Sequence, residues 1–416
     1  MVNAVFGVVI AGLFVTTTTA VFPAWSAIAV ALVIGQLIHR KFNLTLLSIC
    51  GVAALYFSIY IGSQLPIALP DQLFGLTANG SWIVILFVYA AIASMLPVWV
   101  LLQPRDFING LQLFIGLFLL YGAVLLSLPE ITAPAFNNML PANAPSLVPL
   151  LFVTIACGAV SGFHGIVSSG TTSKQLDKEP DARLVGYFSA VGEGSLALIT
   201  IIAVTGVGLA ATPEIWHQIY DQYGTAGAGT FVQGGAQIIH NGWGVPLGIP
   251  TTLLATMVVL FAATTMDTGV RLQRYIIQEW GSIYDLPVLN NNILATVIAV
   301  GSCLLLAFGA GGASGSGGLT IWPLFGSTNQ ILAGLTLLVI SVMLIKLGRP
   351  ARYTLIPMIF VLITSAWAAV IKLIEWYQDG NWLLVTIDVI VIVTSFLVIL
   401  EAASVIGRYR RESHTS

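Results

Sequence analysis

The residues best suited to binding or proton transfer lie between Ser161 and Lys174, within an otherwise apolar chain. Hydroxyl oxygens suit a hard cation such as Na⁺, and an imidazole can carry a proton near neutral pH. A structural interpretation is also open, because such hydroxyls bond to carbonyls of their own helix or seal contacts between helices. The candidate residues of this stretch are Ser161, His164, Ser168, Ser169, Thr171 and Thr172.

A second candidate region contains Ser94, Pro97 and Trp99. Pro97 removes a helix hydrogen bond and frees a carbonyl near residue 93. Discontinuous helices of this kind form substrate sites in secondary transporters, and a simple kink is the structural alternative. Further along the chain, Arg105 and Asp106 are interpreted as an interfacial ion pair that caps the next helix.

Carboxylates inside apolar stretches form the third set of candidates. Asp267 follows Thr264 and precedes Arg271 by one helical turn, so it is either a site residue or half of a local ion pair. A carboxylate at mid-bilayer costs about 2.5–3.5 kcal/mol, so each one needs a reason. Three residues are therefore candidates for proton coupling: His164, Glu193 and Asp267.

The composition indicates an integral membrane protein. Of the 416 residues, 57% are hydrophobic and 8% are charged, which leaves too few charges to cover a soluble fold of this length. A helix needs about 20 mostly apolar residues to cross the bilayer, and this rule predicts an all-α polytopic fold with about 12 transmembrane helices. The expected spans are 4–22, 24–39, 43–62, 82–103, 107–128, 147–169, 184–211, 250–268, 290–311, 328–347, 352–374 and 382–406.

The distribution of basic residues predicts the topology. Of the 15 Lys and Arg residues, Lys372 alone falls outside every second loop and the chain end. Positive residues stay on the cytoplasmic side, so we expect a multi-pass protein of the inner (plasma) membrane with both termini in the cytoplasm. One transmembrane domain is expected over 1–411 and a cytoplasmic tail over 412–416. The segments 212–249 and 311–318 read as an outer loop and a flexible linker.

Several classes of function are excluded by missing motifs. The sequence has no His-Glu-x-x-His, no Gly-x-Ser-x-Gly and no P-loop, so it is predicted to be neither an enzyme nor a nucleotide-driven pump, and to carry no cofactor. It has no basic patch for nucleic acid, and its three distant cysteines suit neither a disulfide framework nor a metal. Passive or ion-coupled transport remains, with the lipid bilayer and a small solute as partners.

The order of the polar motifs resembles the carbon starvation protein A family, over a core of about residues 90–350. That family contains bacterial transporters linked to peptide uptake under starvation and proton-coupled pyruvate transporters. The resemblance implies a LeuT-type inverted-repeat fold, with Ser94 and Pro97 near a helix break and the hydroxyls of Ser168, Ser169, Thr171 and Thr172 at an ion site. The matching stretches are Leu96–Trp99, Pro104–Asp106, Ile155–Lys174, Asp181–Tyr187, Thr264–Arg271 and Trp322–Gln330.

The resemblance also implies that the family's first helices, including an Ala-Gly-Pro-rich broken helix, are missing before Met1. We therefore predict a secondary active transporter of short peptides or of a small carboxylate such as pyruvate, coupled to H⁺ or Na⁺. The alternative is a non-transporting fragment, a sensor, or a subunit of a split transporter that a separate polypeptide completes.

Overall fold

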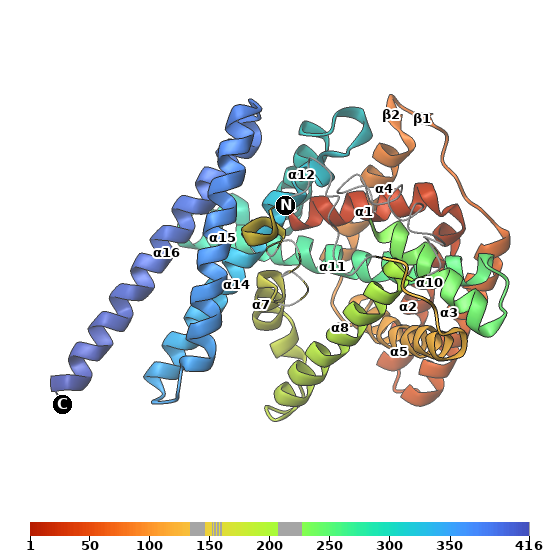
Figure 1. The fold of residues 1–416 in the computed structure, drawn as a ribbon, viewed down its shortest axis with the longest axis horizontal. Coiled ribbons are helices and arrows are strands. Elements are labelled where there is room, and N and C mark those ends of the chain that lie inside the picture. Colours follow the sequence, from red (N-terminus) through yellow and green to blue (C-terminus); the bar gives the residue numbers. More distant parts are fainter. Residues whose placement is uncertain are drawn as a thin grey trace. The chain divides into compact units, whose positions relative to one another are not determined.

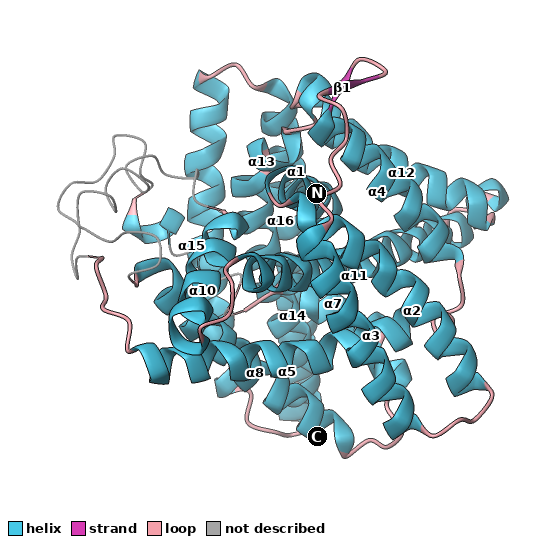
Figure 2. Ribbon diagram, turned by 90° about the vertical axis from the view of Figure 1, so that its right-hand side faces the viewer, coloured by secondary structure: helices cyan, strands magenta, loops and turns pink. Residues whose placement is uncertain are grey.

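Helices dominate the computed structural model, which describes residues 1–133, 146–151, 153, 155, 158, 160–206 and 227–415 (Figures 1 and 2). Among these residues, the only sheet is a hairpin of β1 (Gln72–Leu73) and β2 (Leu76–Thr77). The helices are α1 (Val2–Thr16), α2 (Val21–His39), α3 (Leu44–Gln64), α4 (Ala78–Met95), α5 (Leu102–Ser127), α7 (Gly162–Gly170), α8 (Asp181–Thr205), α10 (Ala228–Trp243), α11 (Gly248–Ile283), α12 (Asn292–Gly309), α13 (Gly317–Thr320), α14 (Trp322–Lys346), α15 (Arg352–Gln378) and α16 (Trp382–Thr415).

Ten helices in the described part of the chain are long and apolar enough to cross a membrane, which confirms the polytopic all-α prediction. The count of about 12 spans is confirmed only in part. The first expected span corresponds to α1, which has 15 residues. The expected span 147–169 lies partly outside the described residues, and its described end contains the nine-residue helix α7.

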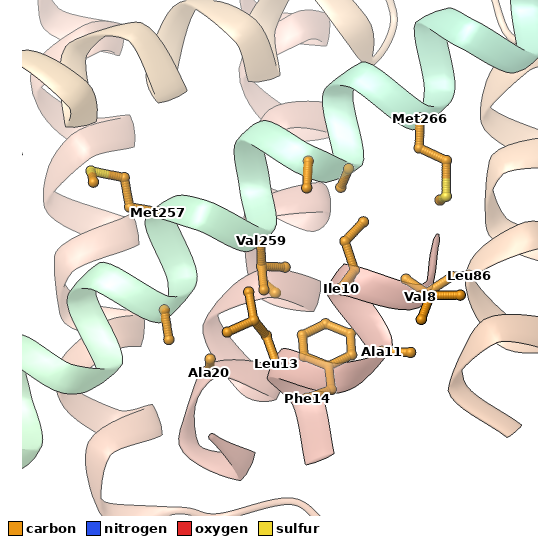
Figure 3. Close-up of a cluster of buried hydrophobic side chains, with 14 of the residues drawn as sticks. Val8, Ile10, Ala11, Leu13, Phe14, Ala20, Leu86, Met257, Val259 and Met266 are labelled. Carbon is orange, nitrogen blue, oxygen red and sulfur yellow. The ribbon is translucent and has the colours of Figure 1, made fainter. Parts of the chain in front are cut away.

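One compact unit comprises Met1–Ala144 and Ser195–Leu319, and α11 forms its centre. In α11, 72% of an 18-residue apolar stretch is buried, which is more than in any of the other long helices described. Apolar side chains of α1, including Ile10 and Phe14, pack against Val259 of α11 (Figure 3). A helix that is apolar on all faces belongs in a protein core, so α11 is placed where it can hold side chains away from lipid and water.

Helix α10 corrects the expectation of an outer loop over 212–249. Its residues Phe231, Val232, Ile238 and Ile239 are buried in the core that α5 and α11 also line. A side chain at Gly242 would lie 2.6 Å from Ala123 of α5, so glycine permits the close approach of the two helices. At 16 residues, the helix is too short for a rule that searches for about 20 apolar residues.

The glycine-rich segment 311–318 is packed, although its composition predicts a flexible linker. Gly317 and Gly318 are buried, and a side chain at Gly318 would lie 2.5 Å from Val8 of α1. The backbone at Gly312 and Gly315 has positive φ angles of 58° and 65°, which glycine adopts without strain. The glycines therefore serve a compact turn against α1.

Three arginines that the pattern of basic residues assigns to cytoplasmic loops lie inside helices. Arg105 follows the start of α5, and Arg271 and Arg274 lie within α11, which continues to Ile283 rather than ending near 268. All three side chains are buried. Because these three arginines do not lie in loops, fewer basic loop residues support the predicted topology.

The other compact unit comprises Pro145–Gly194 and Thr320–Ser416. Its helices α14, α15 and α16 lie side by side (Figure 1). Helix α7 packs on α14, where a side chain at Gly162 would lie 2.4 Å from the carbonyl oxygen of Asn329. Glycine at this position lets the two backbones meet.

Candidate functional site

The first unit holds a cluster of three polar side chains from three helices, two of them buried and the third, Tyr89, half-buried. Arg105 of α5 is 1% exposed, and Asp267 of α11 is 2% exposed. The guanidinium donates through Nη2 to Asp267 Oδ2 and through Nη1 to the hydroxyl of Tyr89 on α4. Tyr89 Oη in turn donates to Asp267 Oδ2 at 2.8 Å. The three groups form a closed triangle that joins α4, α5 and α11.

This cluster overturns two interpretations of the sequence. Arg105 does not cap its helix with Asp106 at an interface, because it is buried and pairs with Asp267 from a distant part of the chain. Arg271 does not take up Asp267 as a local partner either, because its Nη2 donates to the carbonyl oxygen of Ala93 at 3.0 Å. A buried ion pair needs further hydrogen bonds to offset desolvation, and Tyr89 supplies one of them.

The helical structure is interrupted beside this cluster. Helix α4 ends at Met95, and the carbonyl of Ala93, which Pro97 frees, accepts from Arg271 and from the Leu96 amide at 3.3 Å. The freed carbonyl near residue 93 was predicted from Pro97, and the structure confirms it. Residues 96–101 form a non-helical connection between α4 and α5.

The predicted residues around this break have different surroundings. The Ser94 side chain is fully buried and its hydroxyl donates to the carbonyl of Ala91 at 2.9 Å. Pro97 is exposed. Trp99 stacks on His39 of α2 with ring centroids 4.4 Å apart, and it lines a pocket of about 230 Å³. Thr264 of α11 donates back to the Phe261 carbonyl at 3.0 Å.

The predicted hydroxyl set lies in the second unit, on or next to α7. Ser161 precedes the helix, and both its hydroxyl and the Phe163 amide donate to Asn329 Oδ1 of α14, at 3.3 and 2.8 Å. The hydroxyls of Ser168 and Ser169 donate to carbonyls of their own helix, at 2.9 and 3.0 Å. This geometry favours the structural interpretation of these two serines.

The remaining candidates of this unit are spread over several environments. His164 is exposed and its amide lies 3.5 Å from Ser161 Oγ. Thr171 Oγ1 is buried without a hydrogen-bond partner, and Thr172 begins a short 3₁₀ turn. Glu193 is exposed on α8. The predicted site residues therefore fall into two sets, one in each unit.

Sequence reasoning missed Tyr89, Asn109, Gln112 and Arg274. Asn109 and Gln112 follow Arg105 by four and seven residues, so all three lie on one face of α5, and all are buried. That spacing was visible in the sequence as a polar line on an apolar helix. The pairing of Arg105 with Asp267 had no local signal, because the two residues are 162 positions apart.

A helical membrane protein with a buried charged cluster beside a helix break belongs to the class of polytopic membrane proteins with an internal polar site. The family model of the carbon starvation protein CstA matches residues 1–212 and 203–368, so the chain belongs to that family. This confirms the resemblance that the polar motifs indicate.

The curated relatives carry transporter names. The peptide transporter CstA of Campylobacter jejuni is 33% identical over 389 residues, which cover 80% of this chain and 54% of that protein. The pyruvate/proton symporter BtsT of Escherichia coli K12 is 29% identical, with 90% of this chain and 62% of that protein covered. The chain spans about half the length of the CstA relatives it matches. These names agree with the prediction that it is not an enzyme. No solved structure matches it significantly.

Proposed function

We propose that the chain is the membrane domain of a secondary transporter, and that its substrate carries a carboxylate, as pyruvate and the C-terminus of a short peptide both do. It lies in the bacterial inner membrane with both termini in the cytoplasm, and a LeuT-type inverted repeat remains our hypothesis for its architecture. The names of the relatives support transport of such solutes. The substrate class rests on an observation in this chain.

That observation is an excess of buried positive charge in the first unit. Arg105, Arg271 and Arg274 are all buried, whereas Asp267 is the one buried carboxylate among the described residues of this unit. Asp267 already pairs with Arg105. Arg271 and Arg274 each keep an Nε that has no hydrogen-bond partner. An uncompensated charge inside a membrane protein is costly and marks a functional pathway, and an anionic substrate is the group that would compensate it.

Arg271 also contacts the backbone at the helix break. It holds the Ala93 carbonyl that Pro97 frees, so its guanidinium lies at the end of α4. Arginine binds a carboxylate in a bidentate geometry that lysine does not offer. Arg271 and Arg274 are therefore the proposed carboxylate ligands. Ser94 follows Ala93 on α4, and Thr264 lies about two turns before Arg271 on α11.

The coupling ion is proposed to be H⁺, with Asp267 as its carrier. Protonation of Asp267 would remove the charge that holds Arg105, so proton binding and the state of the cluster are linked. His164 and Glu193 remain alternative proton carriers. A Na⁺ site at Ser168, Ser169, Thr171 and Thr172 is the competing proposal, and the back-bonded serine hydroxyls make it the weaker one.

Uptake into proteoliposomes tests the proposal. Labelled pyruvate and a labelled dipeptide are offered to the purified chain, with an imposed proton gradient, with a Na⁺ gradient and with neither. We expect accumulation of one of them with the proton gradient, and its loss in Arg271→Gln. Arg352→Gln is the matched control, because that arginine is exposed and stacks on Tyr353. Equal uptake by Arg271→Gln and the wild type would refute the substrate assignment.

A further inference from the structure

Arg105, Asn109 and Gln112 form a polar line along one face of α5. Among the described side chains of the first unit, Asn109 and Gln112 have the most atoms without a hydrogen-bond partner. Asn109 is 2% exposed and Gln112 is 0% exposed. Both amide atoms of each side chain lack a hydrogen-bond partner in the structure. Buried polar groups are almost always hydrogen-bonded, and leaving them bare is costly. Four such atoms within one helical turn therefore indicate a small polar ligand.

Two contacts fix where this line faces. Arg105 meets Asp267, and a side chain at Gly116 would lie 2.9 Å from the sulfur of Met257. Residue numbers rise along α5 while they fall along α11, so the two helices are antiparallel. Asn109 and Gln112 lie between these contacts, on the face that Arg105 and Gly116 define. They therefore face the stretch of α11 between Asp267 and Met257.

The chemistry of the unpartnered groups selects the ligand. Primary amides both donate and accept, which suits water. At the Arg105 end of the line, a cavity of about 20 Å³ is lined by Tyr89, Arg105 and apolar residues such as Trp25, Leu260 and Ala263, and neither Asn109 nor Gln112 lines it. A water molecule needs about 10–15 Å³, so this cavity is too small for a substrate. A metal cation is disfavoured, because the guanidinium of Arg105 lies on the same face of α5.

We infer that the α5–α11 interface holds a chain of ordered water molecules along Asn109 and Gln112, and that this chain carries protons to and from Asp267. The rise of an α-helix places Gln112 about 10 Å from Arg105, about a third of the hydrocarbon thickness. Thr256 of α11, fully buried with an unpartnered hydroxyl, lies eleven residues, about three turns, before Asp267 and so on the same face of that helix. The inference rests on the proposed proton-coupled transport.

The groups that face Asp267 leave it one open direction. Tyr89 of α4 and Arg105 of α5 both bond to Oδ2, and Arg271 on α11 lies one turn away. Asp106, next to Arg105, is exposed. Cys303 of α12 contacts Gln273. Asp267 Oδ1 has no partner, so it is the atom that can exchange a proton with the water chain.

The transport test uses the double variant Asn109→Leu/Gln112→Leu in proteoliposomes. We expect proton-driven accumulation to fall at least about tenfold, while exchange of internal for external substrate without a gradient changes less than about twofold, because exchange needs no net proton movement. Gln237→Met is the control, since this half-buried amide of α10 donates to Asn241 of the same helix at 3.0 Å. Accumulation at the wild-type level, or equal loss of exchange and accumulation, would overturn the inference.

A second measurement does not depend on transport. Hydroxyl radicals generated from water label methionines that contact water. Met257 is 2% exposed and Met266 is 0% exposed, both on α11. We expect Met257 to be labelled faster than Met266, and the difference to disappear in Asn109→Leu/Gln112→Leu. Equal protection of the two methionines would overturn the water chain. Labelled Met257 in a protein that accumulates no substrate would retain the water chain and reject the proposed function.

Discussion

The two units differ in where their polar side chains find hydrogen-bond partners. In the first unit, Arg105, Asp267 and Tyr89 come from three helices and bond to one another inside an apolar core. In the second unit, Ser168 and Ser169 bond to carbonyls of their own helix. A dense run of hydroxyls in a sequence is thus satisfied locally, whereas isolated charges far apart in the chain depend on one another.

The largest expected effect comes from Asp267→Asn, which leaves the Arg105 guanidinium buried without its counter-charge. Breaking a buried pair costs about 3–5 kcal/mol, so we expect a large loss of thermal stability in detergent. The double variant Arg105→Met/Asp267→Leu should recover much of it, because no charge remains buried. A single variant as stable as the wild type would show that the pair does not stabilise the fold.

Tyr89→Phe should have the next largest effect. The substitution removes a hydroxyl that donates to Asp267 and accepts from Arg105, at an expected cost of about 1.5–3 kcal/mol. Thermal unfolding in detergent measures it, with the exposed Tyr353→Phe of α15 as the control. If both substitutions have the same effect, the triangle contributes nothing beyond the ion pair.

Asn329→Leu tests the polar contact between Asn329 of α14 and the start of α7 in the same way. Its Oδ1 accepts from the Phe163 amide and the Ser161 hydroxyl, so we expect a loss of about 1–2 kcal/mol. Proteolysis near the start of α7 should accelerate. Unchanged protection of α7 would mean that its packing on α14 holds it without this amide.

The smallest effect is expected from Ser168→Ala/Ser169→Ala. Hydroxyls that only bond to their own helix should change stability by no more than about 0.5 kcal/mol each and leave the ion dependence of uptake unaltered. A specific loss of Na⁺-dependent uptake in this variant would assign them to an ion site and reverse the contrast between the units.

Much of the helical fold follows from the sequence, because long apolar stretches have few other structures open to them. The break at Pro97 also follows, since proline removes a backbone donor whatever the tertiary context. Helix α10 does not follow, because its apolar face is short and interrupted by glycines. Its burial depends on partners in α5 and α11 that a local pattern does not contain.

The sequence identifies Asp267 as a residue of the candidate site, but it does not predict the contacts that form the site. Asp267 stands out as a carboxylate in an apolar stretch. Hydropathy, however, places Arg105, Arg271 and Arg274 in loops, because it treats every arginine as an end of a span. Their burial is decided by pairing across helices, as Arg105 with Asp267 and Arg271 with the Ala93 carbonyl illustrate. Such pairing is a property of the tertiary fold.

The central claim, that Arg271 and Arg274 receive a substrate carboxylate, is tested most directly by equilibrium binding to the purified protein. The ligands are pyruvate and a dipeptide, each compared with its neutral primary amide. We expect the wild type to bind one carboxylate at least about tenfold more tightly than its amide, since hydrogen bonds to charged groups contribute about 1.5–3 kcal/mol, and Arg271→Gln/Arg274→Gln to lose this preference. A preference of the same size in the double variant would contradict the account.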